Sequence, residues 1–273
     1  MQPELAVPAC GGNKTNAFAD FLRVVCAILE GEIRKLLHDP LEMLARVVQP
    51  AVWLLVFAPV FSSLRQIPTG GIRYQDFIAP GILAQGVLLL SVVYGINVLF
   101  ERDMGLLQKY LASPASRAAL VLGKALSAGV RNAPQVLVIY ALAAIISAKV
   151  RWNPLAIAAV LLLVILGSAL FCSLSLVAAC LVKNRERFMS INQALTVPLF
   201  FASSALYPVA LMPTWLRRLT YLNPLSYLVD GLRSAMLSQA RSAYGLGVDF
   251  AVQVCGLAAL VLLAARLYPR VEY

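Results

Sequence analysis

The sequence predicts an all-α membrane protein with six transmembrane helices, an amphipathic interfacial helix at the N-terminus and an external re-entrant helical hairpin before the sixth span. Three observations lead to this prediction. The 273 residues are 60% hydrophobic and only 13% charged, whereas soluble domains are about half apolar and about a quarter charged. The apolar residues gather in runs of about 20, the length that crosses a bilayer as a helix. Before the last run lies an apolar stretch that prolines interrupt.

The six expected spans carry almost no charge in their interiors. They cover residues 47–64, 77–100, 118–148, 155–182, 189–207 and 248–267. The third is interrupted by Arg131, Asn132 and Pro134. A charge inside a span costs on the order of 2.5–3.5 kcal/mol on insertion scales. Two interpretations of Arg131 therefore stay open: it contacts substrate or a polar network that includes Asn132, or the span begins later and Arg131 lies near the headgroups.

The formal net charge of +10 indicates orientation rather than a nucleic-acid partner. The basic residues are scattered between apolar runs, as expected of loops beside anionic lipid headgroups. With Arg131 left out, fourteen Lys and Arg residues fall on the side of the two termini and eight on the other. Basic loops stay in the cytoplasm, so we expect a multi-pass protein of the inner (plasma) membrane with both termini cytoplasmic.

The N-terminal part divides into a tail and a helix. Residues 17–37 place apolar side chains at helical spacing, with Asp20, Arg23, Glu30 and Arg34 mainly on the other side. This pattern is typical of a helix at the membrane surface, and a simple interfacial anchor is as good an interpretation as a functional element. Asp39-Pro40 ends it. We therefore expect a tail with its interfacial helix over 1–40 and a six-span domain over 41–273.

The cytoplasmic loop over residues 101–124 is more than a connector. Leu107 belongs to a short apolar stripe within it, Ser113-Pro114 stops the predicted helix, and Ser116 is suited to cap the next one. A short amphipathic helix that projects between two spans is a docking element for a soluble partner, although a solvated loop helix has the same pattern.

The external stretch over residues 207–233 is too apolar for a free loop and too rich in proline for a span. Its aromatic residues, Trp215, Tyr221 and Tyr227, are typical of headgroup level. Irregular backbone at membrane depth occurs only where protein buries it or where it lines a cavity. The stretch is therefore a candidate roof over a transport pathway.

Together these features resemble the membrane domain of type-2 ATP-binding-cassette (ABC) exporters, and the daunorubicin-resistance-type permeases most of all. The cytoplasmic loop is similar to the family's coupling motif, and Asp103 stands where many relatives carry Glu. The motif residues are Glu101, Arg102, Gly105, Ser113, Pro114, Arg117, Gly123 and Lys124. The external hairpin is similar to a second motif through Pro208, Pro213, Trp215, Leu216, Leu222, Asn223, Pro224, Leu225, Tyr227, Asp230 and Arg233.

The resemblance implies a permease subunit that works as a dimer, with a second copy or a similar chain, beside two ABC ATPase subunits. The sequence contains no GxxxxGK[ST] motif, so ATP and Mg are expected in the partner, with no cofactor, metal or catalytic residue in this chain. The resemblance places the cargo route at the first, second and fifth spans. Candidate lining residues are Phe57, Phe61, Val92, Leu195, Leu199 and Phe200, for which ordinary packing is the alternative.

Other classes of function fit the sequence less well. An intramembrane enzyme would need paired acids or a Ser/His couple within the spans, and the single histidine, His38, lies outside them. An ion-coupled carrier would be expected to show inverted repeats and intramembrane acids. The cargo is expected to be drug-like or lipid-like. A polysaccharide or lipo-oligosaccharide is the alternative, although the aromatic residues are dispersed rather than gathered for sugar stacking.

Overall fold

The computed structural model describes residues 17–38, 48–57, 59–60, 73–97, 99–100, 104, 116–146, 148–182, 184–240 and 242–267. This part of the chain is mainly helical, and the β-structure found in it is one isolated antiparallel bridge between Val150 and Leu237. The predicted all-α class is confirmed for these residues. The helices are α1 (Ala17–His38), η2 (Trp53–Phe57), α4 (Tyr74–Tyr94), α7 (Arg117–Ile145), α8 (Pro154–Leu181), α9 (Arg185–Phe201), η3 (Val209–Leu211), α10 (Thr214–Leu222), α11 (Pro224–Met236) and α12 (Leu246–Leu267).

Four of these helices are long and apolar enough to cross a membrane. They are α4, α7, α8 and α12, and they correspond to the second, third, fourth and sixth expected spans. The first expected span, 47–64, lies partly outside the described residues. The fifth corresponds to α9, which has 17 residues and begins with the charged segment 185–187. The total of six spans therefore stays a prediction.

Side-chain caps fix where several helices begin. Ser116 accepts a hydrogen bond from the backbone N–H of Ala119, so the cap that the sequence predicted is confirmed. Asn153 caps α8, whose first residue is Pro154, and Asn184 caps α9 in the same manner. Proline suits the first helical position because its missing N–H would have no partner there.

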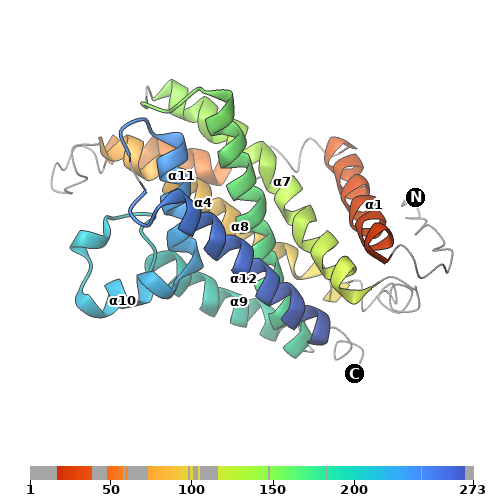
Figure 1. Cartoon of the computed structure of the whole chain (residues 1–273). Coiled ribbons are helices and arrows are strands. Elements are labelled where there is room, and N and C mark those ends of the chain that lie inside the picture. Colours follow the sequence, from red (N-terminus) through yellow and green to blue (C-terminus); the bar gives the residue numbers. More distant parts are fainter. Residues whose placement is uncertain are drawn as a thin grey trace.

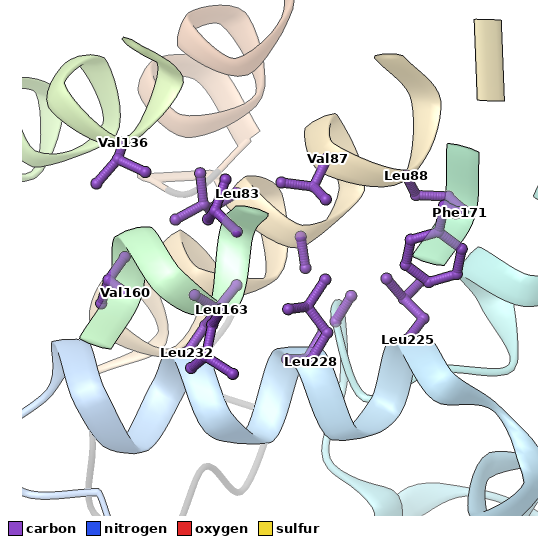
Figure 2. Packing of buried hydrophobic residues seen from close by; sticks show 14 of the residues in the cluster. Leu83, Val87, Leu88, Val136, Val160, Leu163, Phe171, Leu225, Leu228 and Leu232 are labelled. Atoms are coloured by element: carbon purple, nitrogen blue, oxygen red, sulfur yellow. The ribbon is translucent and has the colours of Figure 1, made fainter. Parts of the chain in front are cut away.

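Helix α8 lies at the centre of the bundle, with α4, α7, α11 and α12 packed around it (Figure 1). Its 28 residues contain no charge. Figure 2 shows its side chains meeting those of α4, α7 and α11 in one apolar core. Glycines allow the close approach: a Cβ at Gly129 would lie 2.9 Å from the Cα of Ile165, and one at Gly167 would lie 2.7 Å from a methyl group of Leu228.

The expected hairpin takes the form of two helices, α10 and α11, joined at Asn223. Helix α11 is almost wholly buried and packs against α4, α8 and α12, whereas most of α10 is exposed. The hairpin is thus partly inside the bundle. Its depth in a bilayer, and with it the re-entrant character, stays a prediction.

Candidate coupling and transport site

The apolar face of α1 packs on the first half of α7. Val24 and Val25 are buried against Ala119 and Leu120, and further apolar side chains of both helices surround them. Figure 1 shows α1 alongside α7 at the side of the bundle. The amphipathic pattern predicted for residues 17–37 is therefore present, and its apolar side contacts protein.

The two helices run in the same direction. From the cluster around Val24 the contact continues to Ile28, whose Cδ1 lies so near Gly123 that a Cβ there would be 2.7 Å away. One turn further along α1, Glu32 reaches Arg131. Gly123 belongs to the predicted coupling motif, and here its role is to let α1 approach.

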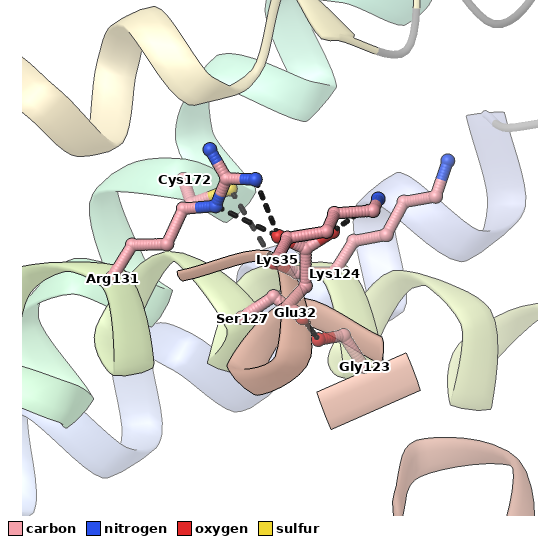
Figure 3. Close-up of polar contacts among 7 residues, drawn as sticks. All are labelled: Glu32, Lys35, Gly123, Lys124, Ser127, Arg131 and Cys172. Carbon is pink, nitrogen blue, oxygen red and sulfur yellow. Dashed lines mark hydrogen bonds and ion pairs between the residues drawn. The ribbon is translucent and has the colours of Figure 1, made fainter. Parts of the chain in front are cut away.

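A largely buried ion pair joins α1 to α7 at Arg131 (Figure 3). Two nitrogens of the Arg131 guanidinium, Nε and an NH2 nitrogen, each lie 2.7 Å from Oε2 of Glu32. The other carboxylate oxygen of Glu32 accepts from Lys35 Nζ at 3.0 Å. The guanidinium also lies over the ring of Tyr94, 4.9 Å from its centroid. Arg131 therefore connects α1, α7 and α4.

The charge on Glu32 is stabilised by its neighbours. Only 8% of the residue is exposed, and burial alone would raise the pKa of the carboxyl. Arg131 and Lys35 outweigh burial, and the pKa of Glu32 lies below its usual value. The carboxylate is therefore ionised at neutral pH and holds the Arg131 charge.

The sequence had left two interpretations of Arg131 open, and neither of them identified Glu32 as its partner. The signal that identifies Glu32 is its position: it follows Ile28 by one turn, on the apolar side of α1. Burying an unpaired acid on such a face, or an unpaired arginine inside a span, costs free energy. An ion pair between the two gives each charge a partner.

Asn132, the neighbour of Arg131, joins three helices. Its amide nitrogen donates to Ser91 Oγ of α4 and to Ser168 Oγ of α8, both at 2.9 Å. Only 1% of Asn132 is exposed. Both amide hydrogens are used, so this polar group is a helix-packing element within the bundle.

Most of the predicted coupling residues lie outside the described residues. These are Glu101, Arg102, Gly105, Leu107, Ser113 and Pro114. Arg117 is described and is exposed in the first turn of α7. Their role in coupling stays a prediction.

The predicted pathway residues fall in different environments. Val92 and Phe200, 7% and 8% exposed, belong to the main apolar core, and Leu199 packs against that core. Leu195 is 41% exposed. Phe57 is the last residue of η2, and Phe61 lies outside the described residues. The exposed large apolar side chains of α9 are Met189, Ile191, Leu195, Val197 and Phe201.

The motif residues of the hairpin hold it against the bundle. Asn223 accepts from the N–H of Leu225 and donates to the carbonyl of Leu199 at 2.6 Å, which fixes both the turn before Pro224 and the end of α9. Pro208 and Pro213 immediately precede η3 and α10, and Trp215 of α10 is 63% exposed.

Two charged hairpin residues are buried with partners. Asp230 accepts from Ser242 Oγ and from the N–H groups of Ala243 and Tyr244. Arg233 donates to the carbonyl of Ser204 at 2.8 Å, and its guanidinium lies 3.8 Å from the centre of the Phe77 ring. These residues order the loops at this end of the bundle, a role that the motif alone did not reveal.

The fold and these contacts define a multi-pass helical membrane protein with a peripheral amphipathic helix tied to its bundle. The chain belongs to the ABC-2 type transporter family, whose model matches residues 23–237. It is a permease subunit of an ABC transporter, and membership implies an ABC ATPase as partner. The resemblance inferred from the sequence is confirmed.

Curated relatives agree with this family. The transport permease ycf38 of Cyanophora paradoxa is 26% identical over 78% of this chain and 74% of its own length. The daunorubicin resistance ABC transporter permease protein DrrB1 of Streptomyces coeruleorubidus is 24% identical over 85% of this chain and 81% of its own. Nodulation protein J of Neorhizobium galegae is 26% identical over 62% and 64%.

Proposed function

We propose that this permease exports an amphipathic, drug-like or lipid-like compound out of the cytoplasm or the inner leaflet, driven by ATP hydrolysis in its partner. The observation that carries the proposal is the similarity to a daunorubicin resistance permease over 85% of the chain. The exposed apolar face of α9 supports it, because its side chains are mainly aliphatic. Such a surface suits a cargo with an apolar body.

The route is proposed to form between two copies of the chain. Side chains fill the core of the single bundle, including two candidate lining residues, Val92 and Phe200. A large amphiphile therefore needs another passage. In a twofold dimer the same surface of each copy meets the other. The exposed face of α9 around Leu195 is proposed as that surface.

The ATPase is proposed to dock at the end of the bundle where α7 begins, with both termini on the same, cytoplasmic side. Two ATPase subunits would serve the permease dimer and supply ATP and Mg. The exposed side chains of Ser116 and Arg117 at the start of α7 leave this end accessible. The 101–117 segment is the proposed contact, and α1 adds to it.

Reconstitution tests the proposal directly. The permease and its partner ABC ATPase are placed in liposomes, and ATP hydrolysis is measured with daunorubicin, with phospholipids of different headgroup and with a soluble oligosaccharide. Stimulation by the drug or by a lipid, together with ATP-dependent transport, is the expected result. Hydrolysis that no amphiphile stimulates would contradict it.

A lipo-oligosaccharide is the second candidate cargo, because the chain is also similar to a nodulation protein. Routes for sugars are expected to present aromatic rings, whose electron-rich faces stack on pyranose rings. On the exposed face of α9 the one aromatic ring is that of Phe201. Stimulation by a lipid-linked oligosaccharide and by no drug would favour this second cargo.

A further inference from the structure

The Glu32–Arg131 pair stands out because it is buried, charged and joins a peripheral helix to the bundle interior. The two residues are 99 positions apart in the chain. Their side chains are 10% and 15% exposed. Two other ion pairs of α1, Arg23–Asp20 and Arg34–Glu30, lie within the helix at exposed or half-exposed positions. The buried pair is therefore unlike its neighbours.

The apolar contact between α1 and α7 does not by itself fix how the two helices are placed along one another. Val24, Val25, Ala119 and Leu120 are aliphatic, and such contacts are not directional. Two guanidinium nitrogens on one carboxylate oxygen are directional, since each N–H points at the acceptor. The ion pair therefore sets the register of α1 on α7.

The pair also lies deep along α7. Arg131 follows Arg117 by 14 residues in α7, which is about 21 Å at 1.5 Å per residue. At that depth the guanidinium contacts the ring of Tyr94 in α4, and the next residue, Asn132, bonds to Ser91 and Ser168. A displacement of α1 therefore reaches the bundle interior at a point where three of its helices meet.

We infer that Glu32 and Arg131 are positioning residues that transmit displacement of α1 to α7 and α4, and so couple ATP hydrolysis in the partner to movement of cargo. The inference rests on the proposed function, in which the ATPase contacts the end of the bundle where α7 begins. Neither residue contacts cargo in this role. Displacement of α1 acts on α7 and α4 through Arg131, whose side chain Glu32 holds in place.

The structure offers a covalent substitute for the ion pair. The Cβ of Ile28 lies 3.3 Å from the position of a Cβ at Gly123, close to the 3.5–4.5 Å usual in disulfides. Ile28→Cys with Gly123→Cys, in a background with Cys10 and the exposed Cys26 and Cys255 changed to Ser, should cross-link α1 to α7. The bond then holds the register without the charges.

The experiment compares Glu32→Gln and Arg131→Gln with the reversed pair Glu32→Arg/Arg131→Glu, all in the reconstituted complex. The readout is cargo moved per ATP hydrolysed. We expect each single change to lower this ratio by about 2- to 30-fold, the range seen when a residue along a coupling path is altered. We expect the reversed pair, and Glu32→Gln carrying the 28–123 disulfide, to regain much of it. Glu30→Gln, on the exposed side of α1, is the matched control and should change nothing.

The cross-link itself gives a second readout that needs neither cargo nor ATP. In membranes, the 28–123 disulfide should form more slowly when Glu32 is Gln than when it is Glu. This arm reports on the positioning even if the wild-type complex transports none of the compounds tested, so failure of the proposed function is distinguishable. An unchanged ratio and an unchanged cross-linking rate in Glu32→Gln would overturn the inference. The inference would also be overturned if neither the reversed pair nor the disulfide restored the ratio of cargo moved to ATP hydrolysed, in variants that are inserted at normal levels.

Discussion

Replacing Asn132 with Leu should weaken the bundle by a small and calculable amount. Leu has the same branched shape and number of side-chain heavy atoms, so the change removes the two hydrogen bonds to Ser91 and Ser168 without opening a cavity. Hydrogen bonds between transmembrane helices contribute about 0.6 kcal/mol each on average and about 1.7 kcal/mol at most. We therefore expect the free energy of unfolding to fall by about 1 kcal/mol.

Such a loss corresponds to roughly a five- to tenfold change in the unfolding equilibrium, because about 1.4 kcal/mol is tenfold. Titration of the purified permease from mild detergent into SDS, followed by tryptophan fluorescence, measures it. A double-mutant cycle isolates the bonds: in a Ser91→Ala/Ser168→Ala background, Asn132→Leu should have almost no effect. Transport should persist, since Asn132 is buried within a single bundle.

Two results would refute this reasoning. One is an equal loss of stability in the presence and absence of the serine hydroxyls, which would mean that the amide acts through other contacts. The other is a loss above about 4 kcal/mol, beyond what two such bonds supply even at their upper limit. Lost transport at normal stability would instead give Asn132 a role in transport beyond helix packing.

Three further predictions address the topology, the docking site and the route. Cysteines introduced at Ser238 and Ser116, both exposed, should be labelled from outside the cell at 238 and not at 116; the opposite pattern would reverse the predicted orientation. Leu107→Asp or deletion of Gly105 should leave the protein in the membrane but separate ATP hydrolysis from transport, and coupled transport at normal rates in both variants would exclude the docking role. Leu195→Trp should block export and alter basal ATPase activity at normal protein levels, whereas in a packed core the same overpacking would cost about 1–3 kcal/mol and lower the protein level.

The sequence alone predicts the spanning helices well where apolar content decides burial. Helix α8 is the simplest case, because it has no charge and its neighbours surround it. Helix ends follow other rules. The second span was expected from Phe77, but α4 begins at Tyr74, because Asp76 in its first turn pairs with Arg73 and accepts from the N–H of Lys149. An acid at a helix N-terminus is favourable there, whereas on a hydropathy scale it marks the end of a span.

The parts of the site that the sequence did not predict depend on contacts between distant segments. Helical periodicity places Glu32 on the apolar face of α1, but it does not say which helix that face meets. The same holds for Asp230, whose partners at 242–244 follow from the way the chain returns toward α11. Both residues are buried charges, so a search for acids on apolar helix faces would have found them as candidates without naming their partners.

The order of Glu32 and Arg131 along the chain has a consequence for biosynthesis. The acid leaves the ribosome 99 residues before the arginine, an interval of roughly 5–20 s at usual elongation rates. When the α7 segment enters the translocon, Glu32 has therefore already been synthesised. It can act as the counter-ion of Arg131, the side chain of α7 whose insertion costs the most free energy. Insertion of that segment should then depend on a helix far upstream, and deleting α1 should leave α7 poorly inserted even when every residue of α7 is intact.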